Sequence, residues 1–83
     1  MERKQVYELI DGERDYQDSK PPRNKTDNEW TVSEWINFIE FQLNEAKLAI
    51  YFMSEEKALE HVRKLTALGV ACMEYNDTLP RSK

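Results

Sequence analysis

The strongest constraint on the fold is an apolar seam that runs without a break through residues 32–53. Its members recur at alternating steps of four and three, which is the heptad spacing of helices that pack on other helices. They are Val32, Ile36, Ile39, Leu43, Ala46, Ile50 and Met53. No run of the chain alternates with period two, so the spacing predicts a long helix rather than a strand.

The same helix carries a second apolar stripe beside the seam, formed by Trp35, Phe38, Ala49 and Phe52. A surface helix needs one apolar stripe about 100° wide. Because this helix has more, we expect it to pack on two sides. Helices of its own chain would cover one part, and another subunit the remainder. Trp35 is expected in the core.

Two further helices flank it. Thr31 and Glu34 have the spacing of a capping box, and Ser54 is a suitable N-cap before Glu55 and Glu56. Pro21 and Pro22 end the first helix, whose apolar face holds Val6, Leu9, Ile10 and Tyr16. The expected segments are helices at about 3–17, 32–53 and 55–75, a polar loop at 18–31 and a loose tail at 77–83.

The length of 83 residues suits one domain, 1–83, with a thin core. One cysteine, Cys72, allows no intramolecular disulfide, so we expect oligomerisation to supply stability. The fold class predicted is all-α: a three-helix subunit with two long antiparallel helices, packing into an oligomeric helical bundle.

The formal net charge of −4 disfavours generic DNA binding. No secretory signal or membrane-spanning run is visible, so the expected compartment is the cytoplasm. We expect no cofactor, no metal and no catalytic residue. Cys72 is interpreted as a buried structural thiol and His61 as a surface histidine. Asp15 and Asp18 are three apart; they are either part of a magnesium site or solvated surface acids.

Cations and aromatic residues gather around the break between the first two helices, where residues 13–31 read ERDYQDSKPPRNKTDNEWT. The loop cations serve no helix face, and arginine suits phosphate. A base can stack on Tyr16 or Trp30, although Trp30 is equally suited to a hydrophobic staple on the second helix. The expected ligand-binding residues are Arg14, Tyr16, Lys20, Arg23, Lys25, Trp30, Arg63 and Lys64. The alternative is ordinary charge mixing.

Three segments resemble small phage and prophage proteins: ERDYQDSK, EWINFIEFQLNEAK and VRKLTALGVACMEYND. Some of that group look like the cyclic-nucleotide sponges that blunt CBASS-type bacterial defence. The resemblance implies a protein of the host-cell cytoplasm that binds a small nucleotide as a homo-oligomer.

A more distant similarity is to MazG-like nucleotide pyrophosphohydrolases, which implies associating helical subunits that hold magnesium. That pattern has a glutamate pair on one helix and an ExxD pair on the next. Glu40 and Glu45 have the wrong spacing for the first pair, and Arg63 falls where the aspartate is expected after Glu60. A cation there repels Mg²⁺ and attracts phosphate.

The sequence therefore leads to one expected function, with two alternatives left open. The expected function is non-enzymatic sequestration of a small nucleotide, such as a cyclic nucleotide immune signal. The first alternative is a reduced MazG-like, Mg-dependent pyrophosphohydrolase. The second is a protein–protein inhibitor or assembly factor with no small-molecule ligand.

Overall fold

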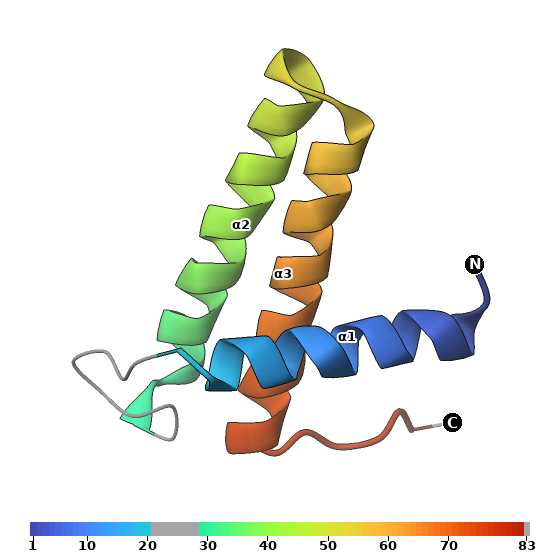
Figure 1. Ribbon diagram of the computed structural model, residues 1–83. Helices are drawn as coiled ribbons and strands as arrows, with labels where there is room; N and C mark the ends of the chain where they lie inside the picture. The colour runs from blue at the N-terminus through green and yellow to red at the C-terminus, as the bar shows by residue number, and fades with distance from the viewer. Residues whose placement is uncertain (21–28, 83) are drawn as a thin grey trace.

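The computed structural model describes residues 1–20 and 29–82, and these residues form three helices: α1 (Arg3–Asp18), α2 (Val32–Phe52) and α3 (Glu55–Tyr75). The predicted all-α class is confirmed, and the helix ends differ from the expected ones by one residue at the end of α1 and of α2. Helices α2 and α3 form an antiparallel hairpin, and α1 crosses the C-terminal half of α3 (Figure 1). Oligomerisation stays a prediction.

Local hydrogen bonds fix the starts of the two long helices. The hydroxyl of Thr31 accepts from the amide of Glu34 at 3.2 Å, and the Glu34 carboxylate accepts from the amide of Thr31 at 3.1 Å. The predicted capping box is therefore present. Ser54 caps α3 by accepting from the amide of Lys57 at 3.1 Å, as predicted. Because Met53 and Ser54 alone separate the two helices, the hairpin is tightly connected.

Small side chains make up most of the buried apolar residues of α2 and α3. The buried apolar residues of these helices are Trp35, Ala46, Ala49, Ala58, Ala67 and Ala71. Trp35 is the one large member, and its ring lies parallel to that of Tyr75 with centroids 6.1 Å apart. The prediction that Trp35 belongs to the core is confirmed. Its indole Nε1 is buried and has no hydrogen-bond partner among the residues that the structure describes.

Helix α1 packs on α3 through a mixed surface rather than through a purely apolar one. Its buried residues are Ile10, Glu13 and Arg14, whereas Val6, Leu9 and Tyr16 are exposed. A Cβ added at Gly12 would have nothing within 4 Å, so no close helix contact requires a glycine at this position. Charged side chains therefore dominate the contact that places α1.

Candidate functional site

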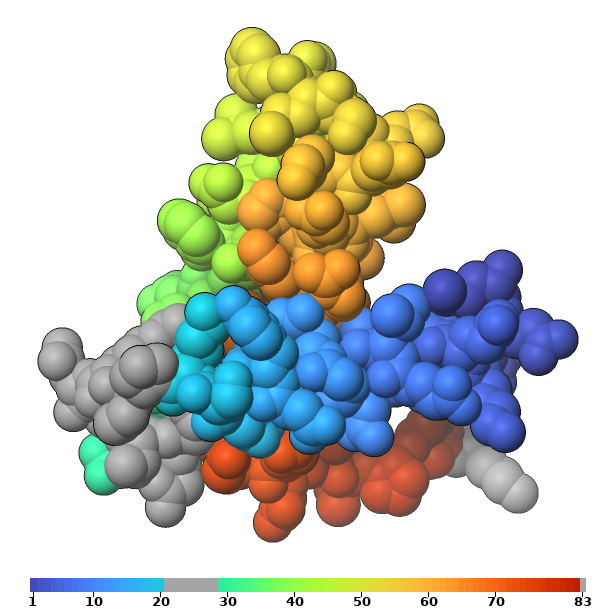
Figure 2. Space-filling model, in the orientation of Figure 1, coloured from blue at the N-terminus to red at the C-terminus, as the bar shows by residue number. Residues whose placement is uncertain are grey.

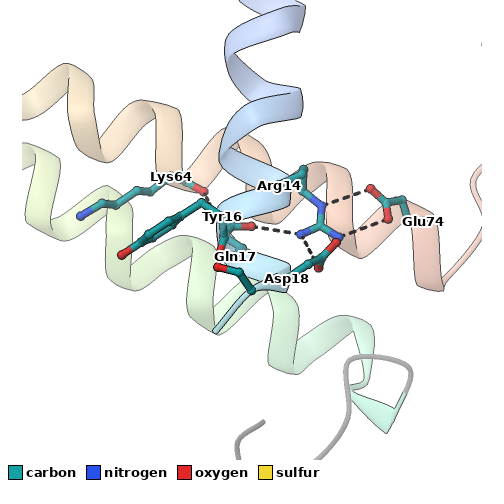
Figure 3. A network of polar contacts seen from close by, with 7 residues as sticks. Arg14, Tyr16, Gln17, Asp18, Lys64 and Glu74 are labelled. Carbon is teal, nitrogen blue, oxygen red and sulfur yellow. Dashed lines mark hydrogen bonds and ion pairs between the residues drawn. The ribbon is translucent and has the colours of Figure 1, made fainter. Parts of the chain in front are cut away.

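Two ion pairs join α1 to α3 at the point where the helices cross. On α3, Arg63 donates through Nε to the carboxylate of Glu13 at 2.9 Å. On α1, Arg14 donates from Nε and Nη2 to the two carboxylate oxygens of Glu74, at 3.1 and 3.2 Å (Figure 3). Each helix contributes one cation and one anion. We call these four residues the α1–α3 clamp.

The surroundings of Arg14 hold its guanidinium in place. Its Nη1 lies 3.1 Å from Oδ1 of Asp18 and 3.4 Å from Oε1 of Gln17 (Figure 3). Burial alone would lower the pKa of Arg14, but the hydrogen bond with Glu74 and the charges of Asp18 and Glu74 outweigh it and raise the pKa above its ordinary value. All three guanidinium nitrogens are engaged within the protein. Arg14 therefore acts first as a fixed structural cation.

The end of α1 presents a different kind of cation to solvent. The ammonium of Lys20 lies 4.4 Å from the centroid of the Tyr16 ring, and both side chains are exposed. The side-chain amide of Gln17 donates to the backbone carbonyl of Lys64 at 3.3 Å, which brings α3 against this end of α1. In Figure 3 the side chains of Tyr16 and Lys64 extend in the same direction from their two helices.

The structure thus brings five of the expected ligand residues to the crossing of α1 and α3. They are Arg14, Tyr16, Lys20, Arg63 and Lys64. Trp30 lies just before α2, with its ring edge-on to Phe38 of the second helical turn at a centroid distance of 4.9 Å, so it packs on α2. Arg23 and Lys25 lie outside the described residues. The ligand-binding role of all eight stays a prediction.

Sequence reasoning missed the acidic half of the clamp. Arg63 and Glu74 are eleven residues apart on α3, a spacing that returns to the same helix face after three turns. Glu13 and Arg14 are adjacent on α1. Opposite charges at these spacings on both helices were a signal that α1 and α3 form ion pairs with each other. That signal could have assigned Arg14 and Arg63 to those ion pairs.

Acidic and sulfur ligands do not converge in the part of the chain that the structure describes. Within residues 1–20 and 29–82, no group of three His, Cys, Asp or Glu side chains is close enough to share a metal ion. Asp18 is paired with Arg14, and Glu60 lies 3.4 Å from Lys57. Both of these acids therefore have a cation as their neighbour.

Two smaller expectations need correction. His61 is half-buried rather than a surface residue, because its Nδ1 lies 2.8 Å from the side-chain oxygen of Gln42 on the neighbouring helix. Cys72 is a free thiol, as expected, but it is half-buried instead of fully enclosed. Both residues lie at the edge of the α2–α3 contact, where alanines leave the helices close together and the flanking side chains partly open to solvent.

A groove of about 360 Å³ opens at the tip of the hairpin, away from the crossing of α1 and α3. Its apolar wall includes Ala46 and Ile50 of α2 and Leu59 and Val62 of α3, and its edge carries Lys47 and Glu55. None of the described ligand candidates lines it. The groove and the described ligand candidates therefore lie in different parts of the molecule.

Comparison of the chain with protein-family models, with curated proteins and with solved structures gives no match. Among the described residues, no helix combines the length and the apolar character needed to cross a membrane.

Proposed function

We propose that the chain binds a small nucleotide at the crossing of α1 and α3 and sequesters it without cleaving it. The observation that carries this proposal is the exposed Tyr16–Lys20 pair at the end of α1, which Gln17 links to the backbone carbonyl of Lys64 on α3. An aromatic ring next to mobile ammonium groups offers a face for a base and charge for a phosphate. The resemblance to cyclic-nucleotide sponges supports a cyclic nucleotide signal as the ligand.

Binding would exchange one contact of Tyr16 for another. Lys20 now rests against the ring, an interaction worth about 0.5–1 kcal/mol at an exposed site. A stacked base gains about 1–3 kcal/mol. If the base takes the ring face, Lys20 is released toward the phosphate and forms a charge-assisted contact there. The exchange therefore favours the nucleotide.

The two arginines have a supporting role in this proposal. Arg14 and Arg63 are already bound to Glu74 and Glu13, so they hold α1 against α3. Their positive charges are balanced by these two carboxylates. Lys20 and Lys64 make no ion pair with any described residue, and they supply the charge that a phosphate meets. The predicted contacts of Arg23 and Lys25 would add to theirs.

The absence of turnover rests on residue chemistry. The resemblance to MazG-like enzymes calls for an acidic metal ligand where Arg63 stands, and Arg63 is hydrogen-bonded to a buried carboxylate of the same protein. The cation is therefore built into the fold and would oppose a magnesium ion at that position. Release of pyrophosphate from a nucleoside triphosphate, with dependence on Mg²⁺, would contradict this part of the proposal.

Calorimetric titration of mono-, di- and cyclic nucleotides tests the binding. For a nucleotide that binds, Lys20→Ala, Lys64→Ala, Arg23→Ala and Lys25→Ala should each weaken affinity by about 1.5–3 kcal/mol per lost charged hydrogen bond. Tyr16→Ala should remove the stacking contribution without changing the salt dependence. Lys57→Ala is the matched control, because Lys57 lies on the same face of α3 two turns before Lys64 and pairs with Glu60. Equal effects of Lys57→Ala and Lys64→Ala, or no heat with any nucleotide, would contradict the proposed site.

A further inference from the structure

One side of the α2–α3 hairpin is apolar and uncovered in the single chain. We call it the hairpin face, and its residues are each 42–64% exposed: Val32, Ile36, Leu43, Ile50, Leu59 and Val62. The groove at the hairpin tip is lined by Ile50 of α2 and by Leu59 and Val62 of α3, so the two helices present these three side chains on a common side.

Helix α1 leaves this face open because it packs elsewhere on α3. Val62 and Met73 each precede a residue of the clamp, Arg63 or Glu74, and consecutive helical residues point about 100° apart. The clamp therefore holds α1 on one side of α3 while Val62 and Met73 face another. Both are exposed.

The accessible surface and the radius of gyration of the chain both exceed those of a compact monomer. Its accessible surface is 6951 Å², whereas a compact monomer of this mass exposes about 5,200 Å². Its radius of gyration is 13.8 Å, against about 11.8 Å for a compact chain of this length. Residues 77–82 after α3 contribute to the difference, and the hairpin face contributes as well. A standard interface buries about 800 Å² on each partner. Figure 2 shows the open angle that α1 makes with the hairpin.

The heptad seam of α2 matches itself when two copies run antiparallel. In that arrangement each seam residue of one copy packs against a different seam residue of the other copy, at the same height along the paired helices. Leu43 of one copy then lies against Ala46 of the other, and Ile39 against Ile50. A large side chain meets a small one at the centre, beside the groove that Ala46 and Ile50 line. The seam therefore supplies both a protruding side chain, Leu43, and a small one, Ala46, that leaves room for it.

The charges along the edge of the seam fit the same alignment. Glu40 and Lys47 are seven residues apart, so they occupy the same edge of α2, and both are exposed without an ion pair to any described residue. When Leu43 meets Ala46 across an antiparallel pair, Glu40 of each copy lies next to Lys47 of the other, and the contact occurs twice. In a parallel alignment, identical positions of the two copies lie at the same height. Glu40 of one copy then does not lie next to Lys47 of the other.

We infer that a second copy of the chain covers the hairpin face, with the two α2 helices antiparallel across a two-fold axis and Glu40 of each copy beside Lys47 of the other. The product is a four-helix bundle with one α1 on each outer side. This inference concerns a surface separate from the crossing of α1 and α3, so it stands or falls independently of nucleotide binding.

Sedimentation equilibrium of the full chain tests the inference. The wild-type protein should have the mass of a dimer at micromolar concentration. Glu40→Lys and Lys47→Glu should each weaken the dimer by about tenfold or more, because each change turns two attractive contacts into two repulsive ones. The double variant should regain wild-type affinity within about threefold, since the pairs are restored with their signs exchanged. Glu8→Lys, an exposed change on α1, is the control and should leave the mass unchanged.

Mixing the two single variants gives the sharpest readout. In a heterodimer of Glu40→Lys with Lys47→Glu, both contacts join opposite charges, so the mixture should dimerise at least as strongly as the wild type. Leu43→Asp should give a monomer whose circular dichroism shows whether the helices persist. A wild-type monomer or trimer would overturn the inference. A dimer with the same affinity in the wild type and in both single charge variants, and with no gain in affinity when the two variants are mixed, would overturn the antiparallel register.

Discussion

Glu13 and Arg14 of α1 place opposite charges in the contact with α3. On α3, Arg63 pairs with Glu13 and Glu74 pairs with Arg14. Their side chains are only 8% and 6% exposed, whereas those of Arg63 and Glu74 are 39% and 47% exposed. The two ion pairs therefore differ in which partner is desolvated. Removing a half-exposed partner leaves a buried charge without compensation, which costs more than removing a surface pair.

Arg63→Ala should destabilise the fold by about 1–3 kcal/mol, because it leaves the buried carboxylate of Glu13 without its donor. Urea unfolding followed by circular dichroism measures the change. Lys57→Ala removes a pair on the same helix whose side chains are 51% and 43% exposed, and it should change stability by less than about 0.5 kcal/mol. Equal losses in the two variants would mean that the Arg63–Glu13 contact does not anchor α1.

Gly12→Ala should stabilise the protein by about 0.5–1 kcal/mol. Position 12 is in a helix interior, where glycine is unfavourable, and nothing lies within 4 Å of an added Cβ. A rise in Tm of about 2–8 °C is expected for a domain of this size. Gly69→Ala has equal space within the chain, but Gly69 lies beside Val62 on the side of the hairpin face. A smaller gain at position 69 than at 12 is therefore expected from the dimer, and a loss at position 12 would contradict the open space seen there.

The sequence identified Arg14 and Arg63 as cations worth attention but could not assign their partners. The type and charge of a residue are known from its own position in the sequence. The partners Glu74 and Glu13, however, lie sixty and fifty residues away from Arg14 and Arg63 in the chain. The relevant fact is which helix faces meet, and a single helix pattern does not contain it. Lys20 and Tyr16 were easier to associate, because residues four apart on one helix are neighbours.

At the scale of elements, helix starts followed from short-range chemistry. A hydroxyl at the N-cap reaches an amide three residues on, so Thr31 and Ser54 could be recognised from the residues beside them. The buried face of α1 was harder to predict. Val6, Leu9 and Tyr16 have helical spacing, yet α3 covers the side that holds Ile10 and the clamp instead. Periodicity shows that a helix exists, but the packing partner selects the face.

Thr31→Ala should cost about 1 kcal/mol of stability, because it leaves the amide of Glu34 without its acceptor and opens the capping box. Thermal unfolding monitored at 222 nm measures the loss. Ser33→Ala, two residues into the same helix and exposed, is the matched control and should be neutral or slightly stabilising. If both substitutions have the same effect, the cap contributes nothing beyond helix propensity.

At the scale of the whole molecule, the antiparallel pair of long helices was predictable because two apolar periodic segments are joined by a short connection around Ser54. The excess of apolar residues on α2 was also predictable. What covers that excess was not, because an apolar stripe has the same pattern whether its partner is another helix of the chain or a second chain. Residues on the hairpin face, such as Ile36 and Leu43, remain exposed in the single chain for this reason.

The melting temperature of the wild-type protein should rise with protein concentration, because dimerisation stabilises the folded chain by mass action. Scanning calorimetry at concentrations from ten micromolar to one millimolar measures the trend. Leu43→Asp should lower Tm and remove the concentration dependence, since a charge at the centre of the hairpin face prevents association. A wild-type Tm that is the same at every concentration would show that folding and association are not coupled.

The buried alanines of α2 and α3 have a consequence for the calorimetry of unfolding. The unfolding heat capacity change comes mainly from apolar surface that becomes exposed, and alanine contributes little such surface compared with leucine or isoleucine. A chain whose interior holds Ala46, Ala49, Ala58, Ala67 and Ala71 therefore has a small heat capacity change when it unfolds alone. Its stability curve is correspondingly flatter, and the larger side chains that a second copy would enclose would add to the curvature.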